Sequence, residues 1–198
     1  MTLDVPTSPS IPIFWRWFQD NEQDLFVFES DMERVFARLT DAMQAVHPEL
    51  TFEFGPVELG KREFVISAGG IREAFPAVWA LATGAPSLER WIVIPFRPRR
   101  APGEIRFGQT VVRSSDVAVI PESTEGKVGI QMLIPGYRAT PNSVFEQVGF
   151  LLLDRVLGEF DVETKLGYIE IGPRPDPLPG GAIPLAELPA LLDRVAVN

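Results

Sequence analysis

The chain has 198 residues, of which 45% are hydrophobic, and it carries 18 basic against 27 acidic side chains, for a formal net charge of -9. A chain of this length can bury one sizeable core, and we therefore expect a single domain over residues 1–198. The acidic balance argues against nucleic acid as a partner, and the absence of cysteine excludes disulfides, thiolate metal sites and a cysteine nucleophile.

The N-terminal sequence and the apolar stretches bear on the compartment. The first residues, MTLDVPTSPSIPIF, do not place an apolar segment behind a basic one, as a signal peptide does. The longest uncharged stretch, residues 74–88, is interrupted by Pro76, Gly84 and Pro86 and falls short of the roughly 20 apolar residues that span a bilayer. We therefore expect a cytoplasmic protein without a membrane partner.

In chain order, the first predicted element is a short helix with an aromatic face. Its apolar residues recur at i, i+3, i+4 and i+7, and they are Ile11, Phe14, Trp15 and Phe18. Large rings are mostly core material, so we expect this face to pack inward rather than to form a platform for a ligand. Trp17 lies outside the stripe, and we expect it to be exposed and to contact a partner.

A second helix is predicted from residue 32 to residue 46. Ser30 and Glu33 are spaced as a capping box, in which each side chain accepts a hydrogen bond from the other residue's backbone amide. His47-Pro48 ends the helix, because the residue before a proline is displaced from the helical region.

His47 is the only histidine of the chain. It could serve as a catalytic base or a metal ligand, but we favour a cap that interacts with the dipole at the helix C-terminus. With one histidine and no cysteine, a zinc site would need carboxylates, which suit magnesium or calcium better. We therefore predict no transition metal and no cofactor.

Residues 47–100 are predicted to form the organising segment of the fold, in the order strand, turn, strand, helix, strand. Short strands at 51–54 and 63–66 flank a loop with glycine and proline, a helix follows from 75 to 82, and 91–96 is apolar on both faces. Arg97, Arg99 and Arg100 then form a basic cluster, which we interpret as a solvated face and not as a nucleic-acid site.

The second half of the chain is predicted to add strands, a buried helix and a C-terminal strap. The strands are expected at 104–107, 117–120, 127–134 and 166–171, the buried helix from its cap at Asn142 to 157, and the proline- and glycine-rich strap at 172–184, before a C-terminal helix. Regular strand–helix alternation is rare and no internal repeat is found. We therefore expect an α+β fold with a mainly antiparallel sheet of six or seven strands covered by helices.

Three carboxylates stand at alternate positions in the second half: Glu159, Asp161 and Glu163. An extended segment would place all three on one side, where they could bind a divalent cation. A solvated turn-and-edge face is the alternative that we favour.

Four motifs resemble an uncharacterised family of bacterial proteins. They are F-W-x-W-F at 14–18, H-P-x-L-x-F-E-F-G-P at 47–56, K-R-E-F-x-I-S-A-G-G at 61–70 and L-G-E-x-x-V-E at 157–163. The resemblance implies a bacterial, cytoplasmic, single-domain protein without an assigned activity, and it carries over no catalytic residues.

Three classes of function remain open. Because the chain has no nucleophile–base motif of the G-x-S-x-G type, we favour a non-enzymatic protein-interaction or binding module. An enzyme that uses carboxylates, and a small-molecule-binding domain with a pocket between helix and sheet, are the alternatives. No catalytic residue is assigned, and the candidate ligand- or partner-binding residues are Trp17, Glu53, Arg62, Arg97, Asp161 and Glu163.

Overall fold

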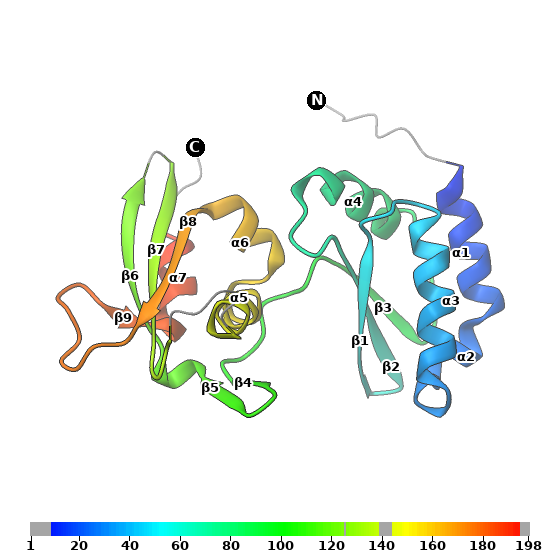
Figure 1. Cartoon of the computed structure of the whole chain (residues 1–198). Coiled ribbons are helices and arrows are strands. Elements are labelled where there is room, and N and C mark those ends of the chain that lie inside the picture. Colours follow the sequence, from blue (N-terminus) through cyan, green and yellow to red (C-terminus); the bar gives the residue numbers. More distant parts are fainter. Residues whose placement is uncertain (1–8, 125, 139–143, 195–198) are drawn as a thin grey trace. The chain divides into compact units, whose positions relative to one another are not determined.

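The computed structural model describes residues 9–124, 126–138 and 144–194 (Figure 1). It divides into two compact units, Met1–Arg97 (unit 1) and Pro98–Asn198 (unit 2), and each unit has its own cluster of buried apolar side chains. Two such units stand where one domain was expected. Whether they unfold together as one domain stays a prediction.

Unit 1 consists of an N-terminal group of helices followed by a hairpin, a helix and a strand. Its elements are α1 (Ser10–Asp20), α2 (Glu22–Phe26), α3 (Met32–Gln44), β1 (Thr51–Glu58), β2 (Lys61–Ser67), α4 (Phe75–Thr83) and β3 (Trp91–Pro95), with 3-10 turns at Phe28–Ser30 and Arg72–Ala74. The strand order is β1-β2-β3, with β1 antiparallel to β2 and β2 parallel to β3.

The core of unit 1 is built from aromatic rings. The four residues of the aromatic stripe of α1 are all buried, as the sequence predicts. The ring centroid of Phe18 lies 5.0 Å from that of Phe64 on β2 and 5.1 Å from that of Trp91 on β3. Trp15 donates a hydrogen bond through Nε1 to the carbonyl oxygen of Leu81 on α4, at 2.9 Å, so its buried polar atom is satisfied.

The predicted capping box does not form. The hydroxyl of Ser30 donates to the carbonyl oxygen of Val27 at 3.0 Å, because residues 28–30 form a 3-10 turn that draws Ser30 away from the start of α3. Asp31 stands at the N-cap of α3 without a side-chain cap hydrogen bond, and its carboxylate pairs with Arg34 at 2.5 Å.

Unit 2 contains two sheets and three helices among its described residues. Its elements are β4 (Glu104–Phe107), β5 (Thr110–Arg113), β6 (Ala118–Thr124), β7 (Lys127–Ile134), α5 (Val144–Leu157), α6 (Glu159–Lys165), β8 (Leu166–Pro173), β9 (Ile183–Pro184) and α7 (Leu188–Leu192), with 3-10 turns at Ser114–Asp116 and Leu185–Glu187. The predicted cap at Asn142 lies outside the described residues.

The α+β class is confirmed, but the expectation of one sheet of six or seven strands is wrong. The described strands form three separate sheets of three, two and four strands. The four-stranded sheet has the order β8-β7-β6-β9, with β7 and β8 parallel and the other pairs antiparallel. Alternating apolar patterns predicted the strands, but such patterns do not say which strand pairs with which.

The two units share a topology although their sequences show no repeat. In each unit an antiparallel hairpin is followed by a helical crossover, and a third strand then pairs in parallel with the second strand of the hairpin. In unit 1 this motif is β1-β2-α4-β3, and in unit 2 it is β6-β7-α5-α6-β8. A parallel pair requires a crossover of this kind.

The C-terminal segment is part of the core of unit 2. Leu185, Leu188 and Leu192 are at most 1% exposed and belong to the same apolar cluster as Leu152 and Leu153 of α5. The last residues of the strap join the four-stranded sheet, because Ile183 of β9 pairs with Val119 of β6. In the part of the chain that the structure describes, no helix is both long and apolar enough to cross a membrane.

Candidate functional site

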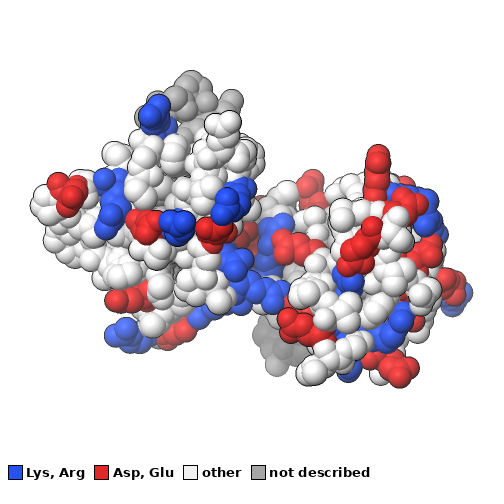
Figure 2. All heavy atoms as spheres, turned by 90° about the horizontal axis from the view of Figure 1, so that it is seen from below, with Lys and Arg blue, Asp and Glu red and all other residues white. Residues whose placement is uncertain are grey.

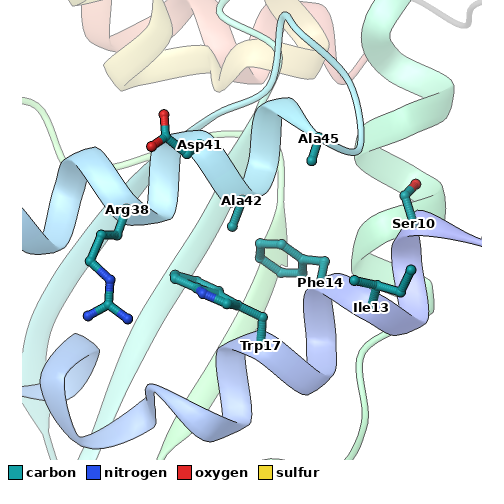
Figure 3. A pocket seen from close by; sticks show the side chains of 8 residues that line it. All are labelled: Ser10, Ile13, Phe14, Trp17, Arg38, Asp41, Ala42 and Ala45. Carbon is teal, nitrogen blue, oxygen red and sulfur yellow. The ribbon is translucent and has the colours of Figure 1, made fainter.

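A groove of about 560 Å³ lies between α1 and α3 in unit 1 (Figure 3). Its lining residues are Ser10, Ile13, Phe14, Trp17, Arg38, Asp41, Ala42 and Ala45. α1 and α3 run side by side (Figure 1), and the groove follows the line where they meet. Among the six predicted binding residues, Trp17 is the one that lies here.

The sequence of the two helices explains why the groove is open. Ile13 and Trp17 are four residues apart, so they form a second stripe on α1 beside the buried aromatic face. Opposite them, α3 presents Ala42 and Ala45, whose short side chains leave the space between the helices unfilled (Figure 3). Ile13 is 67% exposed, whereas Trp17 is half-buried.

Arg38 lies beside Trp17 at one end of the groove. Its guanidinium carbon lies 6.0 Å from the centroid of the Trp17 ring, within the range of a cation–π contact. Arg38 also donates a hydrogen bond to Oδ1 of Asn21, and its Nη1 lies 3.6 Å from Oδ2 of Asp24. Asn21 in turn donates to the carbonyl oxygen of Trp17 at 2.7 Å. The arginine is therefore oriented, and its charge is partly balanced.

Asp41 contributes an accessible negative charge at the rim on α3. Its carboxylate points away from Trp17 in Figure 3 and forms no hydrogen bond or ion pair with the described residues. An exposed carboxylate of this kind is available to a cation on a bound partner.

Glu53 and Arg97 are brought together, as an ion pair with 2.5 Å between Oε1 and Nε. Glu53 is paired across the hairpin with Val65 of β2. Arg62 and Phe64 are two residues apart on β2 and therefore share the opposite face of the sheet from Val65. Residues directly opposite each other share a face of a sheet, and successive residues alternate. The sheet therefore separates Glu53 from Arg62, and these two residues do not converge on one site.

Arg62, one of the candidate ligand- or partner-binding residues, is buried in the core of unit 1. Its side chain is 5% exposed and its guanidinium carbon lies 4.6 Å from the ring centroid of Phe28. Nη2 binds Oε1 of Glu29 at 2.6 Å and Nη1 donates to the carbonyl oxygen of Gly55 at 3.2 Å. The hydrogen bond from Arg62 lowers the pKa of Glu29 below its usual value.

The predicted row of carboxylates is not an extended segment. Glu159–Lys165 forms α6, in which the amide of Val162 donates to the carbonyl oxygen of Gly158 at 3.1 Å. Residues four apart share a face of a helix, so Glu159 and Glu163 lie on one face and Asp161 points elsewhere. Gly158, with φ +77°, ends α5 and lets the chain begin a new helix at once.

Asp161 is bound by cationic side chains of unit 2. Arg99 pairs with it, and Lys165 lies 3.0 Å from its Oδ1. Arg99 also forms two hydrogen bonds with Asp193, at 2.8 and 2.7 Å, and these lower the pKa of Asp193 below its usual value. Among the described residues no group of three or more His, Asp or Glu side chains could hold a metal ion, and the prediction of no tightly bound transition metal remains to be tested.

The basic cluster at residues 97–100 is neutralised in part by acidic neighbours. Arg97 pairs with Glu53, and Arg99 pairs with Asp161 and Asp193. On the face drawn in Figure 2, carboxylates and basic groups are interspersed over much of the surface. The expectation that nucleic acid is not a partner stays a prediction.

Comparisons of the chain with protein-family models, with curated proteins and with solved structures found no match. The resemblance of four motifs to an uncharacterised bacterial family stays a prediction.

Proposed function

We propose that the protein is a non-enzymatic interaction module that binds a protein partner through the groove between α1 and α3. The observation that carries the proposal is the pair Ile13 and Trp17 on α1, which both line the groove: Ile13 is 67% exposed and Trp17 is half-buried. An aromatic ring that is already oriented loses little freedom on binding, which is why tryptophan is enriched among the residues that dominate interface energies.

The positions of the charged candidates support binding over turnover. General acid–base catalysis needs a proton donor and acceptor within reach of one substrate. Glu53 and Arg62 are on opposite faces of a sheet, and Asp161 is engaged by Arg99 and Lys165. The carboxylate-based enzyme is therefore the weaker candidate.

A small-molecule-binding domain is the second candidate, and the size of the groove favours it. A volume of about 560 Å³ falls in the range of ligand pockets, roughly 300–1,000 Å³. The alternative in the sequence analysis expected a pocket between helix and sheet, whereas this groove lies between two helices. It presents few polar groups that could orient a small ligand.

In-cell cross-linking tests the proposal at the groove itself. A photo-reactive amino acid in place of Ile13 should yield a discrete protein adduct, whose partner is identified by mass spectrometry and then titrated as a purified protein. Trp17→Ala should weaken that binding by about tenfold or more, because a central aromatic anchor is lost. Trp79→Ala is the matched control, since Trp79 is a 45% exposed tryptophan on α4 that does not line the groove.

The proposal fails if no adduct forms at Ile13 and a metabolite panel shows saturable turnover that Glu53→Gln or Asp161→Asn abolishes. In that case the carboxylate enzyme takes its place. If no protein adduct forms and a metabolite binds saturably to the wild type but not to Trp17→Ala, the small-molecule domain would be established instead.

A further inference from the structure

We infer that the occupant of the α1–α3 groove is a basic amphipathic helix of the partner protein. This inference rests on the proposed function and names the class of partner that the groove fits. Three properties of the described residues carry it: the chemistry of the groove walls, the dimensions of the groove and the charge of the helices around it.

The walls favour a helix over an extended peptide. Both sides of the groove are α-helices, whose backbone amides and carbonyls are hydrogen-bonded within each helix. An extended peptide docks chiefly through main-chain hydrogen bonds to a free sheet edge, and this groove offers none. A helix satisfies its own backbone and needs only an apolar stripe on its partner.

The dimensions fit about three turns of helix. α1 has 11 residues, which corresponds to a length of about 16 Å at 1.5 Å per residue. The short side chains of Ala42 and Ala45 allow close approach to α3, while Ile13 and Trp17 offer apolar contact from α1. A partner helix with apolar residues at i, i+3, i+4 and i+7 would cover this surface and complete a layer of three helices.

The charge around the groove selects a basic helix. Residues 9–50, which contain α1, α2 and α3, hold eight Asp or Glu residues and three arginines. Glu22, Asp24, Glu29 and Asp31 are paired with arginines, so among the described residues Asp20, Glu33, Asp41 and Glu49 are the carboxylates of this segment without an ion pair. Asp41 lies on the rim without an ion pair among the described residues, and Asp20 is exposed near the end of α1. Lysine side chains that flank an apolar stripe can extend over a helix to such carboxylates while their stems cover apolar surface.

Among the described residues that line the groove, Arg38 is the one cation, and its contacts reduce its repulsion of a basic partner. Its guanidinium is directed to Asn21 and Asp24 and lies over the ring of Trp17. The positive charge is thus shared with an acidic neighbour, whereas the carboxylate of Asp41 is not neutralised in this way.

A pair of synthetic helical peptides tests the inference. One carries leucine on one face and lysine on the other, and the second has the same leucines with glutamate in place of every lysine. Binding to the full chain is measured by protection of Trp17 from acrylamide quenching in the Trp79→Phe variant. The remaining tryptophans, Trp15 and Trp91, are only 3% and 4% exposed, so Trp17 dominates the fluorescence that acrylamide can quench.

The lysine peptide should bind saturably and protect Trp17, and the glutamate peptide should bind at least about tenfold more weakly. Asp41→Asn should weaken the binding of the lysine peptide roughly fivefold, which is the effect of losing one close charge contact in water. Its matched control is Asp20→Asn, which removes an exposed carboxylate that does not line the groove and should have a smaller effect. Ala45→Phe, at an exposed position, fills the groove and should abolish binding while circular dichroism stays unchanged.

Two outcomes overturn the inference. One is equal or tighter binding of the glutamate peptide. The other is binding of the lysine peptide that persists in Ala45→Phe and falls equally in Asp41→Asn and Asp20→Asn, which would show unspecific attraction to an acidic protein. The proposed function fails separately, through the cross-linking experiment. A partner captured at Ile13 that docks through an acidic or extended segment would refute the basic helix and leave the interaction module standing.

Discussion

The phenol of Tyr168 on β8 lies across Gly129 on β7 and donates a hydrogen bond to the carboxylate of Glu122 on β6. Glu122 and Gly129 are directly opposite each other in the hairpin, so the ring spans the width of one strand. Glycine at position 129 provides the space, because a methyl group there would collide with the ring of Tyr168. The contact joins three of the four strands of this sheet.

This contact predicts an unusual titration of Tyr168. The hydrogen bond to Glu122 and the nearby negative charge favour the neutral phenol and raise its pKa to about 12. Because the unfolded chain ionises near pH 10, the contact stabilises the fold fully below pH 10, and this stabilisation is lost as the pH rises toward 12. Absorbance at 295 nm should show the late step, and the stability advantage of the protein over Tyr168→Phe should decline over the same pH range.

Glu122→Gln is the variant that isolates the cause. It should return the titration of Tyr168 toward the usual range, since it removes the charge and keeps the side-chain length. The chain has two tyrosines, so the step that disappears in Tyr168→Phe is assigned without ambiguity. An unchanged late step in Glu122→Gln would contradict the prediction.

We expect Gly129→Ala to lower the free energy of unfolding by about 1–3 kcal/mol, the usual cost of forcing an extra methyl group into a packed site. Chemical denaturation measures this. Gly172→Ala on β8 is the matched control, because no atom lies within 4 Å of a Cβ at that position. In a Tyr168→Ala background, Gly129→Ala should cost much less, and an undiminished cost would place the clash elsewhere.

Arg62 should prove important for stability and not for recognition. Arg62→Met keeps an apolar stem but removes the bonds to Glu29 and Gly55, and we expect a loss of about 2 kcal/mol. Arg62→Lys should not restore the loss, because an ammonium cannot stack on Phe28 and bond both partners at once. Thermal unfolding of these variants is compared with Arg16→Met, an exposed arginine that we expect to cost less than about 0.5 kcal/mol.

The docking of the C-terminal segment predicts that Leu188→Ala destabilises unit 2 by about 2–5 kcal/mol, the usual range for a buried leucine. Truncation after Ile171 should lower the melting temperature further, since it removes Leu185, Leu188 and Leu192 together. Leu178→Ala in the strap is the control, because Leu178 is 38% exposed. An unchanged melting curve after truncation would show that the segment does not contribute to stability.

Local segments were predictable from the sequence because their signals are local. Lys127–Ile134 was predicted with the bounds that the structure has, since the apolar residues Val128, Ile130, Met132 and Ile134 recur at every second position. The segment at Asp161 was misassigned, because alternating carboxylates fit a strand as well as a short helix. Helix formation there depends on Gly158 and on the burial of Val162, which is 5% exposed. This burial requires the neighbouring elements, which a local pattern does not reveal.

The candidate site was predictable only in part. Trp17 lines the groove because it departs from the buried stripe of its own helix, but it is half-buried and not exposed as expected. Arg38 and Asp41 were missed, because on α3 they resemble ordinary solvated residues, and only the pairing of α3 with α1 gives them a shared surface. The available signal was the spacing of Ile13 with Trp17 together with the small residues Ala42 and Ala45.

The shared motif of the two units has a consequence for the order of folding. Each hairpin joins strands that are close in sequence, whereas β3 and β8 reach their parallel partners only after a crossover has formed. Closing the longer loop costs entropy before any contact compensates for it, so we expect the hairpins to be organised in the transition state and the third strands to join later. A destabilising substitution at Phe54 on β1 should then slow refolding, while one at Val93 on β3 should mainly accelerate unfolding.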